Sequence, residues 1–301
     1  MSSDELPALS VLVATRNRAS SLQRALRSLD AAAQAADFAV ELIVVDNGST
    51  DETAALLDAW VRAPERVRLS APGPGKSRAL NHALSFARAP LLAFTDDDVE
   101  VEPQWYVRIV AFLTDHPEYA AAVGRVRMPP DITDPKVIAR VTRYATVPLF
   151  DRGDAVRVVA ELYGCNMVVR REVFATLGTF NERLGVGASG SCEDTDLAER
   201  IRSAGMRIGY MPDAVVYHAV ELDRLTVDYF RAINRRVARS HFEMHPERPW
   251  WAAVPRFLDA AAAFAWWTLI RNPTRRMHAW GRMIRHGELL QLRWRHRASL
   301  R

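Results

Sequence analysis

The chain has 301 residues, 49% of them hydrophobic and 25% charged, which is typical of a globular protein with one large domain or one domain plus an appendage. Its two cysteines exclude a disulfide framework, and the short acidic residues 1–7 do not resemble a signal peptide, so we expect a protein of the reducing cytoplasm. The charge is uneven, because residues 271–301 hold nine arginines and one acid, a net of +8, and the first 270 residues sum to −4.

The first half of the chain alternates predicted strands and helices. Apolar runs of strand length occupy residues 9–14, 42–45, 67–69 and 91–94. Between them apolar residues recur at helical spacing, as at Leu22 and Leu26, and Ser49 with Glu52 forms a capping-box pattern that opens a second helix. Repeated βα units of this length predict an α/β fold, a Rossmann-like, mostly parallel sheet flanked by helices.

The second half is more mixed. Strands are predicted at 123–128, 165–169, 207–210 and 215–217, and helices at 172–177 and 194–204. Residues 184–191 form a glycine-rich loop with little reason to be rigid, and the pattern is helical from residue 225 onward.

Polar clusters follow each of the first four predicted strands, where ligands bind in parallel α/β sheets. They are Thr15-Arg16-Asn17-Arg18, Asp46-Asn47-Gly48-Ser49, Gly75-Lys76-Ser77-Arg78 and Asp96-Asp97-Asp98. Two of these clusters suit a phosphate and two suit a base or a metal, so together they predict a site for a nucleotide diphosphate.

The acidic triplet Asp96-Asp97-Asp98 favours a metal site. Three adjacent carboxylates repel one another, and a cation such as Mg²⁺ or Mn²⁺ would neutralise them and also bind a diphosphate. The alternative is a solvated acidic turn. His218 ends the strand at 215–217 and could complete the metal site, although a lone histidine is more often structural.

A second acidic cluster, Glu193-Asp194, opens a helix directly after the glycine-rich loop. Carboxylates at a helix N-terminus are commonly caps. The adjacent loop favours a general base beneath a flexible lid. The helix dipole would lower the pKa of such a base and neighbouring carboxylates would raise it, so the balance stays open.

Five motifs in this order resemble family 2 glycosyltransferases of the GT-A fold, over residues 9–218. They are the opening strand and loop at 11–18, the second-strand motif at 43–51, the basic helix start at 76–81, the DxD metal motif at 94–98 and the ED motif at 193–197. The resemblance implies a catalytic domain over 1–222, with a nucleotide-binding half at 1–100 and an acceptor half at 101–222, and a helical, arginine-rich extension at 223–301.

The resemblance also implies roles for single residues. Thr15 and Asp46 would contact the nucleoside, Arg78 the base or phosphates, and Asp96 the ribose or donor sugar. The full set expected to bind the nucleotide-sugar is Thr15, Arg16, Asn17, Arg18, Asp46, Asn47, Lys76, Arg78, Asp96 and Asp97. Asp98 would be the main ligand of Mn²⁺ or Mg²⁺, with His218 as its partner. Asp194 would be the general base and Glu193 would orient the acceptor, although these two could exchange roles.

The implied reaction is a single in-line displacement that inverts the anomeric carbon. A UDP-sugar is the favoured donor, and the acceptor would be a hydroxyl of a sugar, a lipid-linked molecule or a small molecule, in polysaccharide, glycolipid or glycoconjugate synthesis. Residues 184–191 contain no aromatic side chain, so the acceptor stays open.

Two other classes of protein are alternatives. Residues 70–77 nearly match the P-loop pattern GxxxxGK[ST], but Ser70 replaces the first glycine, and an NTPase would leave Glu193, Asp194 and His218 unused. A nucleic-acid-binding module would use the basic tail with Trp280 and Trp294, but the chain has no nucleic-acid motif and we expect no such partner.

The tail also suits a membrane surface. A tryptophan-rich apolar segment, 250–270, precedes the arginines, and its uncharged part, 260–270, is shorter than the roughly 20 residues of a membrane span. An interfacial helix followed by a polybasic segment fits anionic lipid, which would place the enzyme on the inner face of the membrane. The alternative is an ordinary helical pair with its arginines in solvent.

Overall fold

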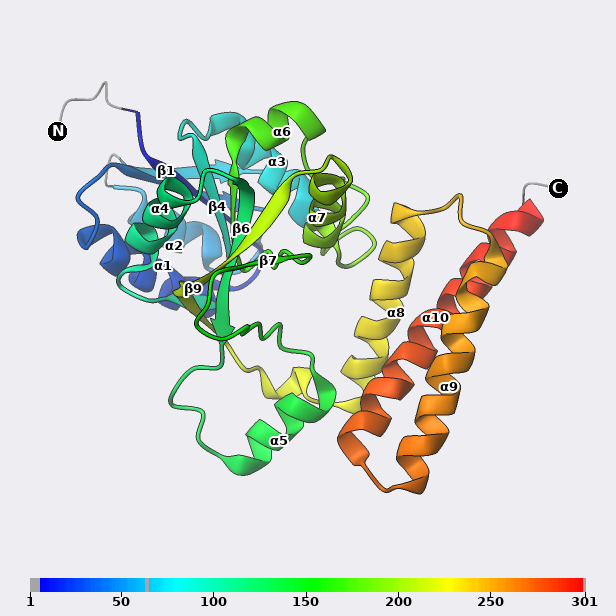
Figure 1. Cartoon of the computed structure of the whole chain (residues 1–301). Coiled ribbons are helices and arrows are strands. Elements are labelled where there is room, and N and C mark those ends of the chain that lie inside the picture. Colours follow the sequence, from blue (N-terminus) through cyan, green and yellow to red (C-terminus); the bar gives the residue numbers. More distant parts are fainter. Residues whose placement is uncertain (1–5, 63–64, 300–301) are drawn as a thin grey trace. The chain divides into compact units, whose positions relative to one another are not determined.

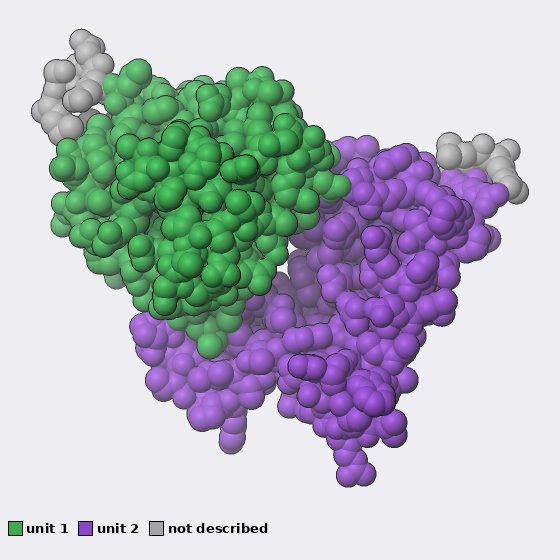
Figure 2. Space-filling model, in the orientation of Figure 1, with its two compact units in different colours: residues 1–128, 149–182, 193–219 green, residues 129–148, 183–192, 220–301 purple. Residues whose placement is uncertain are grey.

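The computed structural model describes residues 6–62 and 65–299, and this part of the chain divides into two compact units (Figures 1 and 2). Unit 1 comprises Met1–Met128, Leu149–Glu182 and Glu193–Ala219. Unit 2 comprises Pro129–Pro148, Arg183–Cys192 and Val220–Arg301. Each unit is described by itself below.

Within the described residues, unit 1 is built on a nine-stranded sheet of order β3-β2-β1-β4-β8-β6-β9-β5, with β7 paired to β9. The strands are β1 Leu9–Thr15, β2 Val40–Asp46, β3 Arg66–Ser70, β4 Leu91–Asp96, β5 Val99–Val101, β6 Tyr119–Arg127, β7 Arg157–Val159, β8 Asn166–Arg170 and β9 Arg207–His218. Strands β1 to β4 are parallel, as are β6 and β9, while β8 runs antiparallel to both β4 and β6. The predicted mostly parallel sheet is confirmed.

Helices cover this sheet on its apolar faces. They are α1 Ala19–Gln34, α2 Thr53–Trp60, α3 Lys76–Phe86, α4 Trp105–Asp115, α6 Arg171–Leu177 and α7 Glu193–Ser203. Every residue of β2 is buried, which is the pattern of a parallel strand covered on both faces. Helix α1 buries one stripe, including Leu22, Leu26 and Leu29, against the core.

Two local predictions were wrong. Helix α2 begins at Thr53 and has no capping box, because the backbone N–H of Ser49 donates to Asp46 (2.9 Å) and Asp51 accepts from the N–H of Thr53 (3.1 Å). The two strands predicted at 207–210 and 215–217 are one strand, β9. Its register against β6 shifts between Gly124 and Arg125, so residues 212–214 form a bulge that accommodates Pro212.

Unit 2 is helical. Its elements are α5 Pro135–Tyr144, the 3₁₀ turns η1 Leu222–Arg224 and η2 Trp250–Ala253, and the helices α8 Val227–Met244, α9 Val254–Leu269 and α10 Pro273–Ser299. Helix α10 packs along both α8 and α9 (Figure 1). The buried cluster here is small, Ala238, Ala253 and Leu289, in contrast to the large core of unit 1. None of the described helices is both long enough and apolar enough to cross a membrane.

Candidate active site

Three strand ends bring the predicted site residues of unit 1 together. Strands β1, β2 and β4 are parallel, with Thr15 beside Asp46 and Ala14 beside Asp96, so their carboxyl ends share one edge of the sheet. Just beyond β4, the backbone oxygen of Asp98 accepts from the N–H of Ala219 (2.9 Å), next to His218 at the end of β9. Residues far apart in sequence therefore meet here.

Asp96, Asp98 and His218 form a group that could hold a metal ion. One potential ligand atom from each lies within 4.8 Å of the others. The Nδ1 of His218 lies 3.0 Å from the carbonyl oxygen of Ala219, an arrangement that directs Nε2 toward Asp98 Oδ1, 3.5 Å away. Two carboxylates suit Mg²⁺ or Mn²⁺, and an imidazole is compatible with Mn²⁺. The sequence placed Asp98 and His218 in this group but gave Asp96 only a donor contact.

Asp97 is not part of this group and instead bonds to the end of β1. Its Oδ2 accepts from the hydroxyl of Thr15 (2.7 Å), and its Oδ1 lies 3.3 Å from Arg18 Nε. Burial raises the pKa of Asp97 to about 7, although Arg18 opposes the shift. Arg18 also reaches Asp98, at 3.1 Å, so it bridges two carboxylates of the triplet. Asp97, whose role the sequence left least defined, thus connects the triplet to the end of β1.

Lys76, at the first position of α3, joins the two acidic clusters. Its ammonium lies 2.6 Å from Asp96 Oδ1 and 3.1 Å from Glu193 Oε1. Burial disfavours the charged form, but Asp96 and Glu193 outweigh it and hold the pKa of Lys76 well above its usual value. Lys76 is therefore a permanent cation between the predicted metal motif and the predicted ED motif.

Asp194 is a partly buried carboxylate held by backbone donors. Its Oδ2 accepts from the N–H of Gly164 (3.0 Å) and its Oδ1 from the N–H of Thr195 (2.7 Å). Burial, and then the charge of Glu193, raise the pKa of Asp194 to about 6. The sequence left open whether the helix dipole lowers the pKa of this carboxyl or its surroundings raise it. In the structure the pKa is raised, so burial and Glu193 dominate.

Sequence reasoning missed Gly164. A Cβ built there would lie 3.5 Å from Lys76 Nζ and 3.7 Å from Asp194 Oδ2, so the backbone passes very close to both side chains. Strand β8 brings it there, because β8 pairs antiparallel with β4 and Asn166 lies beside Thr95. A glycine directly before a predicted strand is a sign of close backbone approach and could have drawn attention to it.

The expected nucleoside side of the site lies around the ends of β1 and β2. Asp46 accepts from Ser49 and has Arg68 Nη2 at 4.0 Å, a neighbour that the sequence did not indicate. Asn47 is buried, and its side-chain oxygen has no hydrogen-bond partner among the described residues. Such an orphaned acceptor is costly unless a ligand or water satisfies it, which makes Asn47 a candidate ligand contact.

Three other predicted donor residues have local roles. Asn17 adopts a left-handed backbone (φ 54°), and its side-chain oxygen accepts from the N–H of Thr50 (2.7 Å), so it connects two strand-end loops. The guanidinium of Arg78 donates to the carbonyls of Pro72 (2.8 Å) and Pro74 (3.0 Å). Arg16 is exposed to solvent. Their contacts with a donor remain predictions.

The glycine-rich loop, residues 184–191, belongs to unit 2 and is more constrained than its composition suggests. Gly185 N–H donates to Ser191 O (3.1 Å), and Gly190 N–H donates to Gly185 O (2.9 Å). The buried hydroxyl of Ser240 on α8 lies 2.7 Å from that of Ser189. The loop is thus folded on itself and bonded to α8, contacts that its composition did not indicate, and its role as a flexible lid stays a prediction.

This sheet and this acidic strand edge define a glycosyltransferase of the GT-A fold. The chain belongs to glycosyl transferase family 2, since the model of that family matches residues 10–178. The predicted family and enzyme class are confirmed. The P-loop alternative is wrong, and Lys76, its supposed phosphate-binding lysine, is paired with Asp96 and Glu193.

Relatives of known role share part of the sequence. Over 232 residues the chain is 29% identical to the succinoglycan biosynthesis protein ExoM of Rhizobium meliloti, covering 75% of this chain and 72% of ExoM. Over 216 residues it is 30% identical to the O-antigen biosynthesis protein RfbC of Myxococcus xanthus, covering 67% of this chain and 16% of RfbC. The chain thus spans most of the first relative and a small part of the second.

Two solved structures have a similar fold. One is the mannosyltransferase PcManGT from Pyrobaculum calidifontis in complex with GDP-Man and Mn²⁺, with a TM-score of 0.57 at 21% identity, covering 98% of this chain and 75% of that one. The other is GalNAc-T7 with UDP, GalNAc and Mn²⁺, with a TM-score of 0.56 at 15% identity, covering 87% and 51%. At these low identities the likeness concerns the fold, and the predicted GT-A fold is confirmed.

Proposed function

We propose that the chain is an inverting, metal-dependent glycosyltransferase that moves a sugar from a nucleotide-diphosphate sugar to an acceptor hydroxyl. The observation that carries this proposal is the grouping of Asp96, Asp98 and His218 within 4.8 Å. In the same unit lies Asp194, a partly buried carboxylate with a pKa of about 6. Lys76 links the two, because it contacts both Asp96 and Glu193.

Asp96, Asp98 and His218 would hold Mn²⁺ or Mg²⁺. The bound ion would supply positive charge that stabilises the departing diphosphate. The chemistry of the donor set supports this assignment, since two carboxylates and an imidazole fixed by Ala219 fit Mn²⁺. The two solved structures described above, PcManGT and GalNAc-T7, were both determined with Mn²⁺, which supports the same ion here.

Asp194 would act as the general base. Its two oxygens are oriented by the backbone N–H groups of Gly164 and Thr195, and its pKa of about 6 leaves it ionised yet basic at neutral pH. The acceptor oxygen would bond to the anomeric carbon as the bond from that carbon to the diphosphate breaks. Asp194 would take the hydroxyl proton, and a single displacement of this kind inverts the anomeric configuration.

Glu193 would serve a different purpose. Its Oε1 lies 3.1 Å from the ammonium of Lys76, so its charge is already engaged. It would orient the acceptor and hold Lys76 in place, while Asp194 receives the proton. These contacts favour Asp194 as the general base and Glu193 as the residue that orients the acceptor, which is one of the two assignments that the sequence left open.

The donor would bind over the ends of β1 and β2, with Asp46 and the orphaned oxygen of Asn47 toward the nucleoside. The family resemblance favours a UDP-sugar, although PcManGT was solved with GDP-Man. The names of ExoM and RfbC point to polysaccharide synthesis, which supports a saccharide or glycoconjugate acceptor for this chain.

Diphosphate release measured across a panel of UDP-, GDP- and dTDP-sugars, with Mn²⁺ and with EDTA, tests the proposal. Thermal shift with the bare nucleotides runs in parallel, because transfer also requires a suitable acceptor. We expect one nucleotide to stabilise the chain only with the metal, and Asp98→Ala to abolish this effect. Asp115→Ala, an exposed carboxylate at the end of α4, is the matched control. Metal-independent binding, or no binding of any nucleotide, would contradict the proposal.

A further inference from the structure

A cavity of about 380 Å³ in unit 2 has a strongly basic lining. It is formed where the end of α8 meets the start of α9 and the middle of α10. The basic side chains that matter for the argument are Arg248, Arg256, Arg282, Arg285, Arg293 and His286. We call this the arginine cavity. Such a space between packed helices is normally lined by apolar side chains.

Helix α10 supplies most of this lining from one face. Arg282, Arg285, Leu289 and Arg293 follow one another at intervals of three or four residues, which is the spacing of a core-facing helical stripe, and His286 lies next to Arg285 on the same side. Of these five, only Leu289 is apolar, and it belongs to the small buried cluster of unit 2. The arginines therefore occupy positions where a helix of this kind would bury leucines.

The deepest of these side chains have nitrogen atoms without hydrogen-bond partners among the described residues. Arg293 is only 6% exposed, and its Nε, like the Nε of Arg285 and the Nδ1 of His286, has no hydrogen-bond partner among the described residues. Within that same part of the chain, no carboxylate oxygen comes within 4.0 Å of Arg256, Arg285 or Arg293. Burying a guanidinium without a partner is costly, so an anionic ligand would relieve this cost.

Nearby acids offset only part of the charge. Asp259 pairs with Arg282 at 2.8 Å, and Glu247 lies 3.7 Å from His245 and partly opposes the effect of burial on the pKa of Arg293. Burial, followed by the charge of Arg282, lowers the pKa of Arg285. Burial, followed by Arg285 and other neighbouring cations, lowers the pKa of His286 to about 4. The arginine cavity thus keeps a positive field that its own acids do not cancel.

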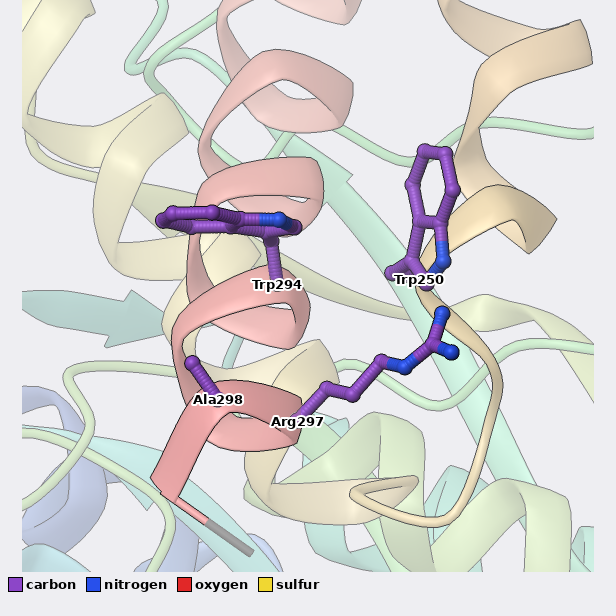
Figure 3. A pocket seen from close by; sticks show the side chains of 4 residues that line it. All are labelled: Trp250, Trp294, Arg297 and Ala298. Atoms are coloured by element: carbon purple, nitrogen blue, oxygen red, sulfur yellow. The ribbon is translucent and has the colours of Figure 1, made fainter. Parts of the chain in front are cut away.

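Aromatic side chains lie beside the arginine cavity. An adjoining pocket of about 670 Å³ shares Arg248 and Arg293 with it and adds Trp250 and Trp251. A third pocket, of about 420 Å³, is lined by Trp250, Trp294, Arg297 and Ala298; in Figure 3 the two tryptophans stand on opposite sides and the Arg297 side chain reaches toward Trp250. Trp251 and Trp294 are 60% and 62% exposed. A basic cavity beside exposed indoles suits a ligand with an anionic head and an apolar body.

We propose that the arginine cavity binds the phosphate or diphosphate group of an amphiphile, with the guanidinium groups on the phosphate oxygens and the tryptophans against the apolar chain. Guanidinium forks match phosphate oxygens in charge and in geometry, which makes arginine the preferred residue for such a group. The site lies wholly in unit 2. It stands independently of whether unit 1 transfers a sugar.

The test uses the full chain in EDTA, which suppresses metal-dependent binding in unit 1. Pyrophosphate binding is measured by isothermal titration, and vesicle binding is measured by co-sedimentation with phosphatidylcholine vesicles that contain or lack a phosphorylated polyprenol. The double variant Arg285→Gln/Arg293→Gln should bind both probes at least about tenfold more weakly. The matched control Arg235→Gln/Arg239→Gln removes two exposed arginines beside Glu288 and should bind as the wild type does.

The outcomes separate the sources of the phosphate. Vesicle binding that needs the phosphorylated polyprenol together with Arg285 and Arg293 supports the proposal. Pyrophosphate binding without vesicle binding would retain a phosphate site but overturn the amphiphile. Equal losses in both double variants, or no binding of either probe, would overturn the site. RNA retention that depends on Arg285 and Arg293 and exceeds lipid binding would overturn it in favour of nucleic acid. Circular dichroism of the variants excludes misfolding as the cause.

Discussion

The acidic site of unit 1 and the arginine cavity of unit 2 differ in whether their charged side chains have partners of opposite charge. In unit 1 the carboxylates face cations of the same chain, since Arg18 bridges Asp97 and Asp98 and Lys76 bridges Asp96 and Glu193. In unit 2 the partly buried Arg285 and the buried Arg293 have no carboxylate within ion-pair distance among the described residues. Cations of the chain offset part of the charge in the first site, whereas the innermost arginines of the second have no such partner, so a ligand of opposite charge would relieve an unpaired charge there.

The largest expected effect tests whether Asp194 is the chemical centre of the first site. Asp194→Asn keeps the side chain's shape but removes the base, and we expect transfer to fall by roughly 10²–10⁴-fold with donor binding unchanged. The rate constant for transfer and nucleotide affinity are both measured. Asp196→Asn, two residues along α7 and paired with Arg200, is the control and should keep most activity. A fall in donor affinity as large as the fall in rate would contradict the assignment.

Stability provides the sharpest contrast between the two regions. Lys76→Met leaves Asp96 and Glu193 without their shared cation and should lower the free energy of unfolding by about 3 kcal/mol. Arg293→Met replaces a buried, unpaired cation by an apolar side chain and should leave stability unchanged or raise it by about 1 kcal/mol. Urea unfolding in EDTA measures both. If Arg293→Met destabilises the protein more than Lys76→Met does, the proposed difference between paired charges in unit 1 and unpaired charges in unit 2 is contradicted.

Metal affinity is the next test of the first site. Asp98→Asn removes a charged ligand of the proposed metal site. Losing a residue that only supports a ligand weakens metal binding by roughly 10- to 100-fold, so losing the ligand itself should weaken Mn²⁺ binding by about 10²-fold or more. Mn²⁺ binding is followed by electron paramagnetic resonance. The arginine-cavity variant Arg285→Gln should leave Mn²⁺ affinity as it is in the wild type. An unchanged affinity in Asp98→Asn would remove Asp98 from the metal site.

The smallest effect concerns pH. The carboxyl of Asp194 has a pKa of about 6, raised from 3.8, and only its ionised form can accept a proton. The transfer rate should therefore be level above pH 7 and fall about tenfold per unit below pH 6. The same raised pKa stabilises the fold below pH 4, and this contribution is lost as the pH rises through 6. A profile of kcat/KM without an acidic limb near pH 6 would contradict the pKa assigned to this base.

Much of the first unit could be predicted from the sequence, because local patterns of apolar and polar residues indicate most of its strands and its ligand-binding edge. Buried strands are continuous apolar runs, and the polar residues that follow them mark the ligand-binding edge, which is how Asp98 and His218 were found. The roles of Gly164 and Arg68 were missed. They depend on β8 pairing with β4 and on β3 pairing with β2, and strand order leaves no trace in a local pattern.

The second unit was predicted less well for a related reason. The sequence shows that arginines are abundant in residues 271–301, but not that Arg293 points inward and is 6% exposed while Trp294 is 62% exposed. Helical spacing alone would have placed Arg282, Arg285 and Arg293 on one face. We treated that face as solvent-exposed or membrane-facing because basic residues usually are.

The bridge made by Lys76 has a further consequence for the order in which ligands enter. Its ammonium already sits on Asp96, so a divalent ion must compete with a resident cation for that carboxylate. A donor diphosphate offers the ammonium a new partner and so frees Asp96. We expect donor and ion to enter with positive cooperativity, each raising the affinity of the other by the same factor, because such coupling is reciprocal. Competition from the Lys76 ammonium would then keep the affinity for the ion low until the nucleotide binds.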